Sequence, residues 1–381
     1  MKKSIILLGA YLLSSQQAVA EYALTDSVSF SGDIRGGYYT LHRDDRNGNQ
    51  DVTDEARLRI RLGLKAKLNN QWQAKVRFAG RYSTVESNSN HFEIFSRIPG
   101  SDGLRHGDST LDEFYVRYQP SAQWDLKIGR FQTKFELAGV AKKSLDRNNS
   151  PNVDITWTDG IHAIYKMQNG WKGHVIIQRN LSAGATEVRR APLDFSDDGS
   201  HVSYFFALEN NEKYHGSIIQ RGIDLTYLPK ALQTDGNSAG RIDDYLALVG
   251  RMSAQWPMSG SMKLMLGSEL GYAFDTPTKV AVSTGTSGDT GGFAGNVKVS
   301  FIDIVPNHSL GIVYGVVQEG WLLSPDFRNN NRLIETRYLW KMDKKQTLEA
   351  RLRHREDLHQ LTGSQEKRED VDLYLRYTYK F

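Results

Sequence analysis

The sequence predicts an all-β protein: a transmembrane, antiparallel, up-and-down β-barrel of about 16 strands. Three observations predict it. Apolar and polar residues alternate over unusually long runs, short connectors alternate with long polar ones, and no segment after the N-terminal region is apolar enough for a membrane-spanning helix. In a bilayer every backbone group needs a partner inside the protein, so strands can cross it only as a closed barrel.

The first 20 residues, MKKSIILLGAYLLSSQQAVA, have the layout of a secretory signal peptide. Two lysines follow Met1, the apolar run Ile5–Leu13 comes next, and the small residues AVA form a cleavage site. The apolar run is well short of the roughly 20 residues that span a bilayer. We therefore expect residues 1–20 to be removed during export by the Sec pathway, and residues 21–381 to form a single barrel domain.

Composition excludes other classes of protein. The mean hydropathy is −0.51, the chain has no Cys, and 48 Lys and Arg stand against 44 Asp and Glu, a net charge of +4. A secreted chain without Cys has no disulfide framework. A nearly balanced charge is also not that of a nucleic-acid-binding protein, so we expect no nucleic-acid partner.

The alternation is clearest in TDEARLRIRLGLKAKLN, residues 53–69, where every second residue from Leu58 to Leu68 is apolar and those between are Arg, Gly or Lys. Successive side chains of a strand point to opposite faces, so one face is apolar and the other basic. Such runs last about ten to fifteen residues, the length of a tilted membrane-spanning strand. Strands of a soluble sandwich are usually about five or six residues long. We expect the apolar face to contact lipid and the charged face to line a wet interior.

The same pattern predicts 16 strands along the chain. They are residues 28–42, 54–68, 71–82, 110–119, 124–131, 155–167, 171–180, 201–209, 217–228, 243–256, 261–275, 292–303, 309–318, 332–341, 346–359 and 370–381. Residues 181–216 carry the weakest signal and are either one strand or all loop. The alternative counts are 14 and 18, because bacterial single-chain barrels have an even number of strands.

Connector lengths indicate which end of the barrel is which. Short connectors such as 69–71 and 343–344 alternate with long polar ones such as 86–109 and 276–291. Outer-membrane barrels have short periplasmic turns and long external loops. Five tryptophans stand beside the short turns, as an aromatic girdle at one bilayer interface would. They are Trp72, Trp124, Trp171, Trp256 and Trp340.

The charged faces of five predicted strands form a candidate pore lining. Closure makes the last strand a neighbour of the first, so the first three and the last two strands are contiguous. The predicted inward cations are Arg35, Arg57, Arg59, Arg61, Lys65, Lys67, Lys75, Arg77, Arg81, Arg351, Arg353, Arg355, Arg376 and Lys380. The predicted inward acids are fewer: Asp33, Glu55, Glu349 and Asp372. Rings of Arg and Lys favour anions in a pore.

This lining favours a water-filled channel for passive diffusion of small hydrophilic solutes, with a preference for anionic ones. If acids of the wall and loops pair with every cation, the field is instead unselective. An exporter of an anionic polysaccharide would share the basic lumen, and a barrel hydrolase is a third possibility.

Motifs for catalysis do not stand out. The chain lacks GxSxG and HExxH patterns, and none of its 10 His lies in a recognisable catalytic motif. The Asp- and Asn-rich residues 44–51 lack the closing glutamate of an EF-hand loop. We therefore expect no enzyme activity, no cofactor and no metal.

The terminal LYLRYTYKF and the segment LKIGRFQTKFE resemble the Gram-negative porin superfamily. Such proteins commonly end an alternating strand in an aromatic residue that the barrel-assembly machinery reads, which implies that Phe381 is an assembly signal. The second segment resembles the strand before the inward-folded third loop of porins, which implies an inward loop near residues 131–154. Its candidate constriction residues are Lys134, Glu136, Lys142, Lys143, Asp146 and Arg147.

The resemblance also implies an outer-membrane location, contact with lipid bilayer and lipopolysaccharide, and a homotrimer. Many porins have a mainly acidic third loop facing basic wall residues. The loop in this chain carries both signs of charge, which argues against a simple cation-selective constriction.

Overall fold

The computed structural model describes residues 21–85, 105–148, 155–180, 191–235 and 240–381, with the backbone alone for 105–109. The predicted signal peptide lies outside these residues. None of the described residues forms a helix long and apolar enough to cross a membrane. The short helical turn η2 (Asp198–Ser200) lies between two strands.

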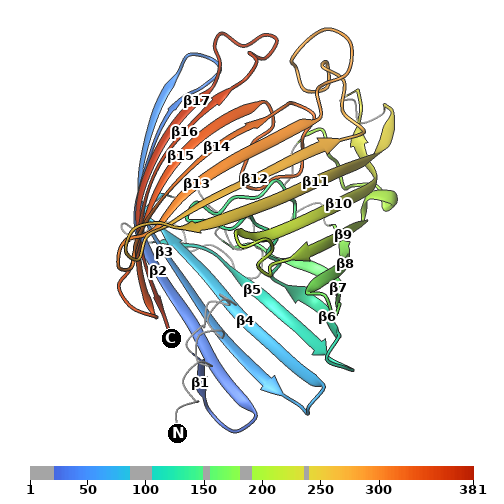
Figure 1. The fold of residues 1–381 in the computed structure, drawn as a ribbon. Coiled ribbons are helices and arrows are strands. Elements are labelled where there is room, and N and C mark those ends of the chain that lie inside the picture. Colours follow the sequence, from blue (N-terminus) through green and yellow to red (C-terminus); the bar gives the residue numbers. More distant parts are fainter. Residues whose placement is uncertain (1–20, 86–104, 149–154, 181–190, 236–239) are drawn as a thin grey trace, which may run out of the picture.

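Sixteen strands, β2 to β17, form one closed antiparallel barrel (Figure 1). Each pairs with the next along the chain, and β17 pairs with β2 to close the ring. The strands are β2 (Val28–Asp44), β3 (Gln50–Lys67), β4 (Trp72–Ser83), β5 (Arg105–Tyr118), β6 (Trp124–Phe131), β7 (Thr158–Lys166), β8 (Trp171–Arg179), β9 (Val202–Asn210), β10 (Ile218–Gln233), β11 (Ile242–Pro257), β12 (Lys263–Ala273), β13 (Phe293–Val305), β14 (His308–Val317), β15 (Asn331–Lys341), β16 (Gln346–Asp357) and β17 (Glu369–Lys380).

The predicted fold class is confirmed, and so is the count of 16. The doubtful segment 181–216 contributes β9, so the 14-strand and 18-strand alternatives are wrong. The largest shifts of a boundary are five residues: β5 begins five residues before its predicted start, and β10 continues five residues beyond its predicted end. Pro229 follows that predicted end, and the ladder absorbs it by a register shift between Leu228 and Leu232. Proline has no N–H to donate and is tolerated in a sheet at such irregularities.

Burial is inverted relative to a soluble protein. On β3, Leu62 and Leu64 are 40% and 43% exposed, while Arg59 and Arg61 are 5% and 6% exposed. The apolar face therefore points outward and the charged face inward, as the alternation predicts. Two of the tryptophans at the short-turn end pack against tyrosines of neighbouring strands: Trp72 on Tyr118 with ring centroids 4.3 Å apart, and Trp124 on Tyr165 at 4.9 Å.

The barrel seam is covered at its short-turn end by a small extra strand, β1 (Glu21–Ala23). It pairs with residues 29–31 of β2, beyond the point where β17 stops. Phe381 ends the chain there, and its ring packs on Phe30 at 5.7 Å and Tyr379 at 6.0 Å. The role of Phe381 as an assembly signal stays a prediction.

One irregularity of the wall changes which residues face inward. A register shift in β5 places Leu111 opposite Phe78 and Glu113 opposite Arg77, leaving Asp112 as an extra residue. Such a β-bulge turns two consecutive side chains toward the same face. Asp112 and Glu113 are both buried on the lumen side, although strict alternation would put Asp112 outside.

Candidate pore and its constriction

The predicted inward cations lie together on one side of the barrel, on β2, β3, β4, β16 and β17. We call this set the basic arc. Within it, Arg35, Arg59 and Arg81 are directly opposite one another across three neighbouring strands. Like charges directly opposite in a sheet destabilise it. The sheet tolerates this row because carboxylates lie between the guanidinium groups.

Nearly every cation of the arc contacts an acid. Arg57 and Arg81 bind Glu55 at 2.6 and 3.4 Å, and Arg59 binds Asp33 at 2.6 Å. Further pairs are Arg61–Asp112 (2.8 Å), Lys75–Glu113 (2.7 Å), Arg77–Glu113 (2.9 Å), Arg353–Asp372 (2.6 Å), Arg355–Asp370 (3.4 Å) and Arg376–Glu349 (2.8 Å). Lys65 pairs with Glu21, and Arg351 with Asp372. Arg35 donates to the hydroxyl of Thr378 at 3.3 Å.

Two of these acids come from the bulge in β5. Asp112 accepts from both Arg61 and Arg77 at 2.8 Å, and it is fully buried. The lining is therefore less one-sided than alternation alone predicts. Cations still exceed acids on the arc, since Asp112, Glu55 and Asp372 each serve two or more of them.

Tyrosines hold several arginines of the arc in place. Tyr39 and Tyr374 pack at 5.3 Å across the β2–β17 pair. Arg57 lies over the Tyr39 ring at 4.4 Å, and Arg351 over the Tyr374 ring at 4.1 Å. Cation–π stacking of this kind limits the motion of a guanidinium group while leaving its charge intact.

The described parts of the loop between β6 and β7 (residues 132–148 and 155–157, hereafter loop 3) lie inside the barrel. Its predicted extent of 131–154 reaches into residues 149–154, outside the described residues. At its root, Phe135 packs on Phe205 at 4.6 Å and edge-on against His174 at 5.2 Å. Phe131, Phe135 and Phe205 are buried, so this root is an apolar anchor on the inner wall.

Farther along, loop 3 is held against the wall opposite the basic arc. The amide of Ala138 donates to Gln220 of β10 at 2.8 Å, and that of Val140 to Ser300 of β13 at 3.1 Å. Lys298 of β13 donates to the carbonyls of Leu137 (3.1 Å) and Lys143 (2.9 Å). These are bonds to loop backbone, so they fix the path of the chain.

A buried ion cluster adds a further anchor. Arg251 of β11 pairs with Asp146 of loop 3, with Asp224 of β10 and with Glu269 of β12, the last at 3.1 Å. All four side chains are at most 2% exposed. Removing Arg251 would leave three buried carboxyl groups without their cation, which makes this cluster a strong constraint on loop 3.

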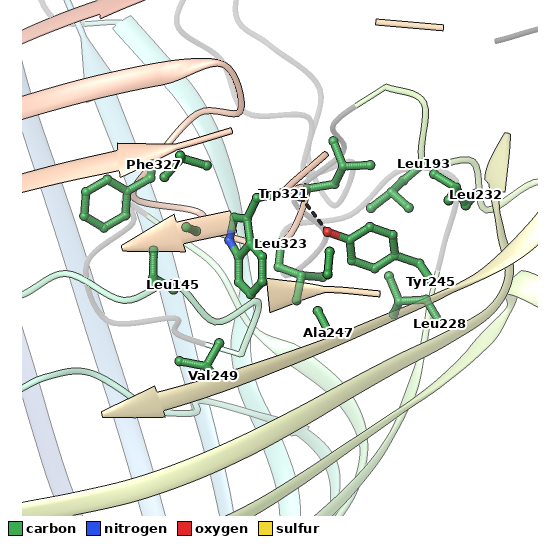
Figure 2. Close-up of a cluster of buried hydrophobic side chains, with 14 of the residues drawn as sticks. Leu145, Leu193, Leu228, Leu232, Tyr245, Ala247, Val249, Trp321, Leu323 and Phe327 are labelled. Carbon is green, nitrogen blue, oxygen red and sulfur yellow. Dashed lines mark hydrogen bonds between the residues drawn. The ribbon is translucent and has the colours of Figure 1, made fainter. Parts of the chain in front are cut away.

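The loop between β14 and β15 (residues 318–330, hereafter loop 7) also folds inward. Its Trp321, Leu323 and Phe327 belong to a buried apolar cluster with Tyr245 and Val249 of β11, as Figure 2 shows. The Tyr245 hydroxyl donates to the Gly320 carbonyl at 2.8 Å. The apolar run WLL in this long connector is unusual for an external loop.

Loops 3 and 7 are joined to each other. The amide of Ser144 donates to Asp326 at 3.0 Å, and the hydroxyl of Ser324 donates to the Ser144 carbonyl at 2.6 Å. Lys143 contacts Asp326 at 3.5 Å and Glu335 of β15 at 3.1 Å. The two loops therefore form one unit against the inner wall.

Glycines on the inner face of β12 and β14 make room for this unit. A Cβ atom at Gly271 would lie 2.6 Å from the Trp321 ring, and one at Gly315 would lie 2.4 Å from Phe327. Gly267 lies under Leu137 and Gly311 under Val140 in the same way. The spacing of four residues in each strand keeps both glycines on one face. This is the signal by which the sequence could have indicated inward loops.

The space that remains lies beside the basic arc. Side chains under the loops are fully enclosed: Lys298 is 1% exposed. Across the lumen, Arg57 and Lys75 keep 25% and 22% of their side-chain surface in contact with solvent. On the loop side, Lys134 is 52% exposed and Lys142 33%. We take the space between these two sets of solvent-exposed cations as the candidate passage.

Three of the six candidate constriction residues belong to this passage. Lys134 and Lys142 flank Glu136, with Nζ atoms 3.3 and 3.5 Å from its Oε1. Both lysines are within electrostatic range of Lys380 on β17. Burial alone would raise the pKa of the Glu136 carboxyl, but the charges of Lys142 and Lys134 lower it overall.

The other three candidates lie away from the passage. Lys143 and Asp146 are the buried anchors described above. Arg147 is buried on the far side, with its guanidinium over the Phe195 ring at 4.6 Å and bonded to Asn180 at 3.1 Å. Among the described residues, no group of three or more His, Asp or Glu side chains is arranged to hold a metal ion.

Part of the sequence and the whole fold are similar to known proteins. Residues 32–160 match the model of a family described as "Putative porin". No curated protein sequence matches the chain. Among solved structures, it is similar to OprB of Pseudomonas putida, with 12% identity, a TM-score of 0.62, and 93% of this chain and 94% of that chain covered.

Two further structures are similar over nearly their whole length. The outer membrane channel DcaP of Acinetobacter baumannii has 12% identity and a TM-score of 0.56, with 93% and 97% covered. The anion-selective porin from Comamonas acidovorans has 12% identity and a TM-score of 0.55, with 93% and 99% covered. The chain therefore has the fold of these outer-membrane porins, and residues 32–160 match a porin family model.

Proposed function

We propose that the protein is an outer-membrane channel through which small hydrophilic solutes diffuse, with a preference for anions. The fold and the family match support the channel. One observation carries the preference: Lys134 and Lys142 of loop 3 face the basic arc, so cations border the passage on both sides. Rings of Lys and Arg favour anions in a pore.

Ion pairing reduces this preference without cancelling it. Glu136 offsets part of the charge of Lys134 and Lys142, but one carboxylate serves two ammonium groups. On the arc, Asp372 likewise serves Arg351, Arg353 and Arg355. The excess charge is positive, and the low dielectric of the wall strengthens its field in the passage. The similarity to an anion-selective porin agrees with this proposal.

Solutes with a carboxylate or a phosphate fit the exposed guanidinium groups best. Arg57, stacked on Tyr39, presents a planar group whose N–H donors match an oxyanion. Its ion pair with Glu55 leaves part of this group in contact with water. We propose brief contact rather than tight binding, because conduction requires that a solute also leave.

Two other functions are alternatives to the channel, and the first of them would share the basic lumen. An exporter of an anionic polysaccharide would pass long polymers, and a barrel hydrolase would turn over lipid or peptide. Lipase and protease assays on the refolded protein would reveal hydrolysis. Passage of polymers that exceed the size limit for small solutes would reveal export.

The direct experiment is a solute series in liposomes that contain the protein. Neutral, carboxylate-bearing and amine-bearing solutes of matched size should all enter below a size limit, with the carboxylates fastest. Equal rates for the carboxylate and amine members would contradict the anion preference. Absence of entry by every small solute would contradict the channel itself.

A further inference from the structure

Four arginines converge on one carboxylate at the end of the barrel with the long connectors, where β16, β17 and β2 lie side by side (Figure 1). Arg355, Asp370 and Arg43 are directly opposite one another across these three strands. The Asp370 side chain is fully buried. The arginines in contact with its carboxylate are Arg43 (3.3 Å), Arg355 (3.4 Å), Arg368 (3.2 Å) and Arg328. We call these five side chains the mouth site.

The mouth site continues the basic arc toward the long connectors. Arg355 belongs to the arc, and it also contacts Asp372, the next acid along the wall, at 3.8 Å. Arg328 comes from loop 7, and Arg368 comes from the connector between β16 and β17 (residues 358–368, hereafter loop 8). With the long loops external, a solute that enters from outside meets the mouth site before it meets the rest of the arc.

The arginines of the mouth site keep part of their surface in contact with solvent. The exposed fraction of the side chain is 35% for Arg43, 23% for Arg328 and 24% for Arg368. A guanidinium group has five N–H donors, and the two oxygens of one carboxylate cannot accept from all the donors of four such groups. The mouth site therefore presents several N–H donors and an excess of positive charge at one place.

Neighbouring acids reduce this charge without cancelling it. Asp357 is buried and bound to Arg46 through two bonds of 2.6 and 3.1 Å, so that pair is neutral. Two further acids, Asp45 and Asp51, lie in and beside the connector between β2 and β3, and neither forms an ion pair within the described part of the chain. Solvent screens charges on such connectors more than buried ones. Even with both acids counted beside Asp370, four cations stand against three carboxylates.

Three connectors hold the mouth site in a fixed shape. The side chain of Asn330, at the end of loop 7, bonds to loop 8 twice: its Oδ1 accepts from the His359 amide at 2.9 Å, and its Nδ2 donates to the His359 carbonyl at 2.7 Å. The Arg46 carbonyl, between β2 and β3, accepts from the amides of Gln365 and Glu366 at 2.9 and 3.2 Å. A site built in advance loses less conformational freedom when a ligand binds.

We propose that the mouth site binds a compact oxyanion that carries two or more negative charges, such as a diphosphate or a tricarboxylate. Coulomb attraction grows with the charge of the ligand, so the same cluster holds a polyvalent anion more strongly than a monovalent one. Adjacent oxygens of such a ligand match the paired N–H donors of neighbouring guanidinium groups. The proposal rests on the proposed channel and deepens it, because it names a class of solute that the channel takes up from outside.

The test is isothermal titration calorimetry of the full chain in detergent at low ionic strength, with inorganic pyrophosphate, citrate and acetate as probes. Wild type should bind a polyvalent probe about tenfold more tightly than acetate, or better. The double variant Arg328→Gln, Arg368→Gln should lose about tenfold in affinity for that probe. The matched control is Arg117→Gln, Arg332→Gln, which removes the same charge elsewhere. Arg117 pairs with Asp125 beside a short turn at the other end of the barrel, and Arg332 is exposed and pairs with Glu356.

The single variant Arg368→Gln keeps the test valid if the double variant does not fold, because Arg368 lies in a connector and does not hold loop 7. It should bind the polyvalent probe more weakly than wild type does. Tight binding of pyrophosphate alone, or of citrate alone, would support the site and identify its ligand as a phosphate or a carboxylate compound.

Three outcomes would overturn the proposal: equal affinity of wild type for acetate and for both polyvalent probes, wild-type affinity in the Arg328 and Arg368 variants, or an equal loss in the control. The solute series in liposomes tests the channel separately. Wild type that admits small solutes but does not prefer a polyvalent probe would contradict the mouth site alone. Wild type that binds pyrophosphate or citrate but admits no solute would contradict the channel.

Discussion

Gly32 and Phe381 close the barrel by exchanging two backbone hydrogen bonds. The amide of Gly32 donates to the Phe381 carbonyl at 2.7 Å, and the amide of Phe381 donates to the Gly32 carbonyl at 3.0 Å. The Phe381 ring lies against the position that a side chain at residue 32 would occupy, 2.6 Å from an ideal Cβ. The last residue of the chain therefore fits against a glycine of the first long strand, at the seam where the two ends of the sheet meet.

Gly32→Val should weaken closure of the barrel. Its Cβ would meet both the Phe381 ring and the Arg61 carbonyl at 2.6 Å, and overpacking of this kind costs about 1–3 kcal/mol. We expect less folded protein, measured as the fraction that resists unfolding in detergent gels before heating. Gly36→Val is the matched control, since nothing lies within 4 Å of a Cβ at that outward position of the same strand. Equal folded fractions for the two variants would contradict this account of the seam.

Arg251→Met should destabilise the protein and loosen loop 3. The substitution leaves Asp146, Asp224 and Glu269 buried without their cation, and breaking a buried ion pair costs about 3–5 kcal/mol. The urea midpoint, followed by tryptophan fluorescence, should fall, and single-channel current should become noisier.

The control for Arg251→Met is Arg332→Met, which breaks an exposed pair worth at most about 1 kcal/mol. If the control loses as much stability as Arg251→Met, the buried cluster is not the anchor. If Arg251→Met lowers the urea midpoint but leaves the current noise unchanged, Arg251 stabilises the fold without holding loop 3 in position.

Trp321→Ala should widen the passage. Trp321 is fully buried between loop 7 and the inner wall, and deletion of a buried Trp costs about 3–5 kcal/mol at most sites. Loop 7 would lose its main contact with β12, so single-channel conductance should rise. Trp256→Ala is the control, because Trp256 is 39% exposed on the outer face near a short turn. A rise in both variants, or in neither, would show that loop 7 does not limit conductance.

The contribution of Glu136 to ion selectivity should be constant between about pH 8 and pH 5. The lysines around Glu136 lower its pKa below the usual value, so the carboxylate stays charged throughout this range. Below the folded pKa the carboxyl is protonated, its pairing with Lys134 and Lys142 is lost, and anion preference should increase. Reversal potentials over a pH series would measure this. In Glu136→Gln the increase should already be present at pH 8; a variant that matches wild type there would contradict the assignment.

Much of the fold follows from residue alternation. The run from Leu58 to Leu68 fixes the orientation of its strand, because only one parity can face lipid. The ends of strands are less predictable. β10 continues through Pro229, although a proline usually indicates the end of a strand. The bulge at Asp112 could not be predicted either. An alternation of apolar and polar residues with a period of two does not show where a strand contains one extra residue.

The interior was harder to predict than the wall. Charged parity placed the cations of the arc, but not their pairing with Asp112 or Glu335, which depends on neighbouring strands far apart in the sequence. Loop 7 was missed because an apolar run in a long connector does not say where it packs. Gly271 and Gly315 make that packing possible. The reason for glycine at these positions is seen only in the structure, where Trp321 and Phe327 pack against them.

The anion preference of the channel is tested most directly by the reversal potential of single channels under a salt gradient. The measurement compares wild type with the double variant Lys134→Gln, Lys142→Gln. Lys279→Gln with Lys344→Gln is the control, with the same loss of charge at exposed connector positions. We expect an anion-selective wild type, a marked loss of selectivity in the loop 3 variant and no change in the control. Cation selectivity of the wild type, or equal potentials in all three proteins, would contradict the account.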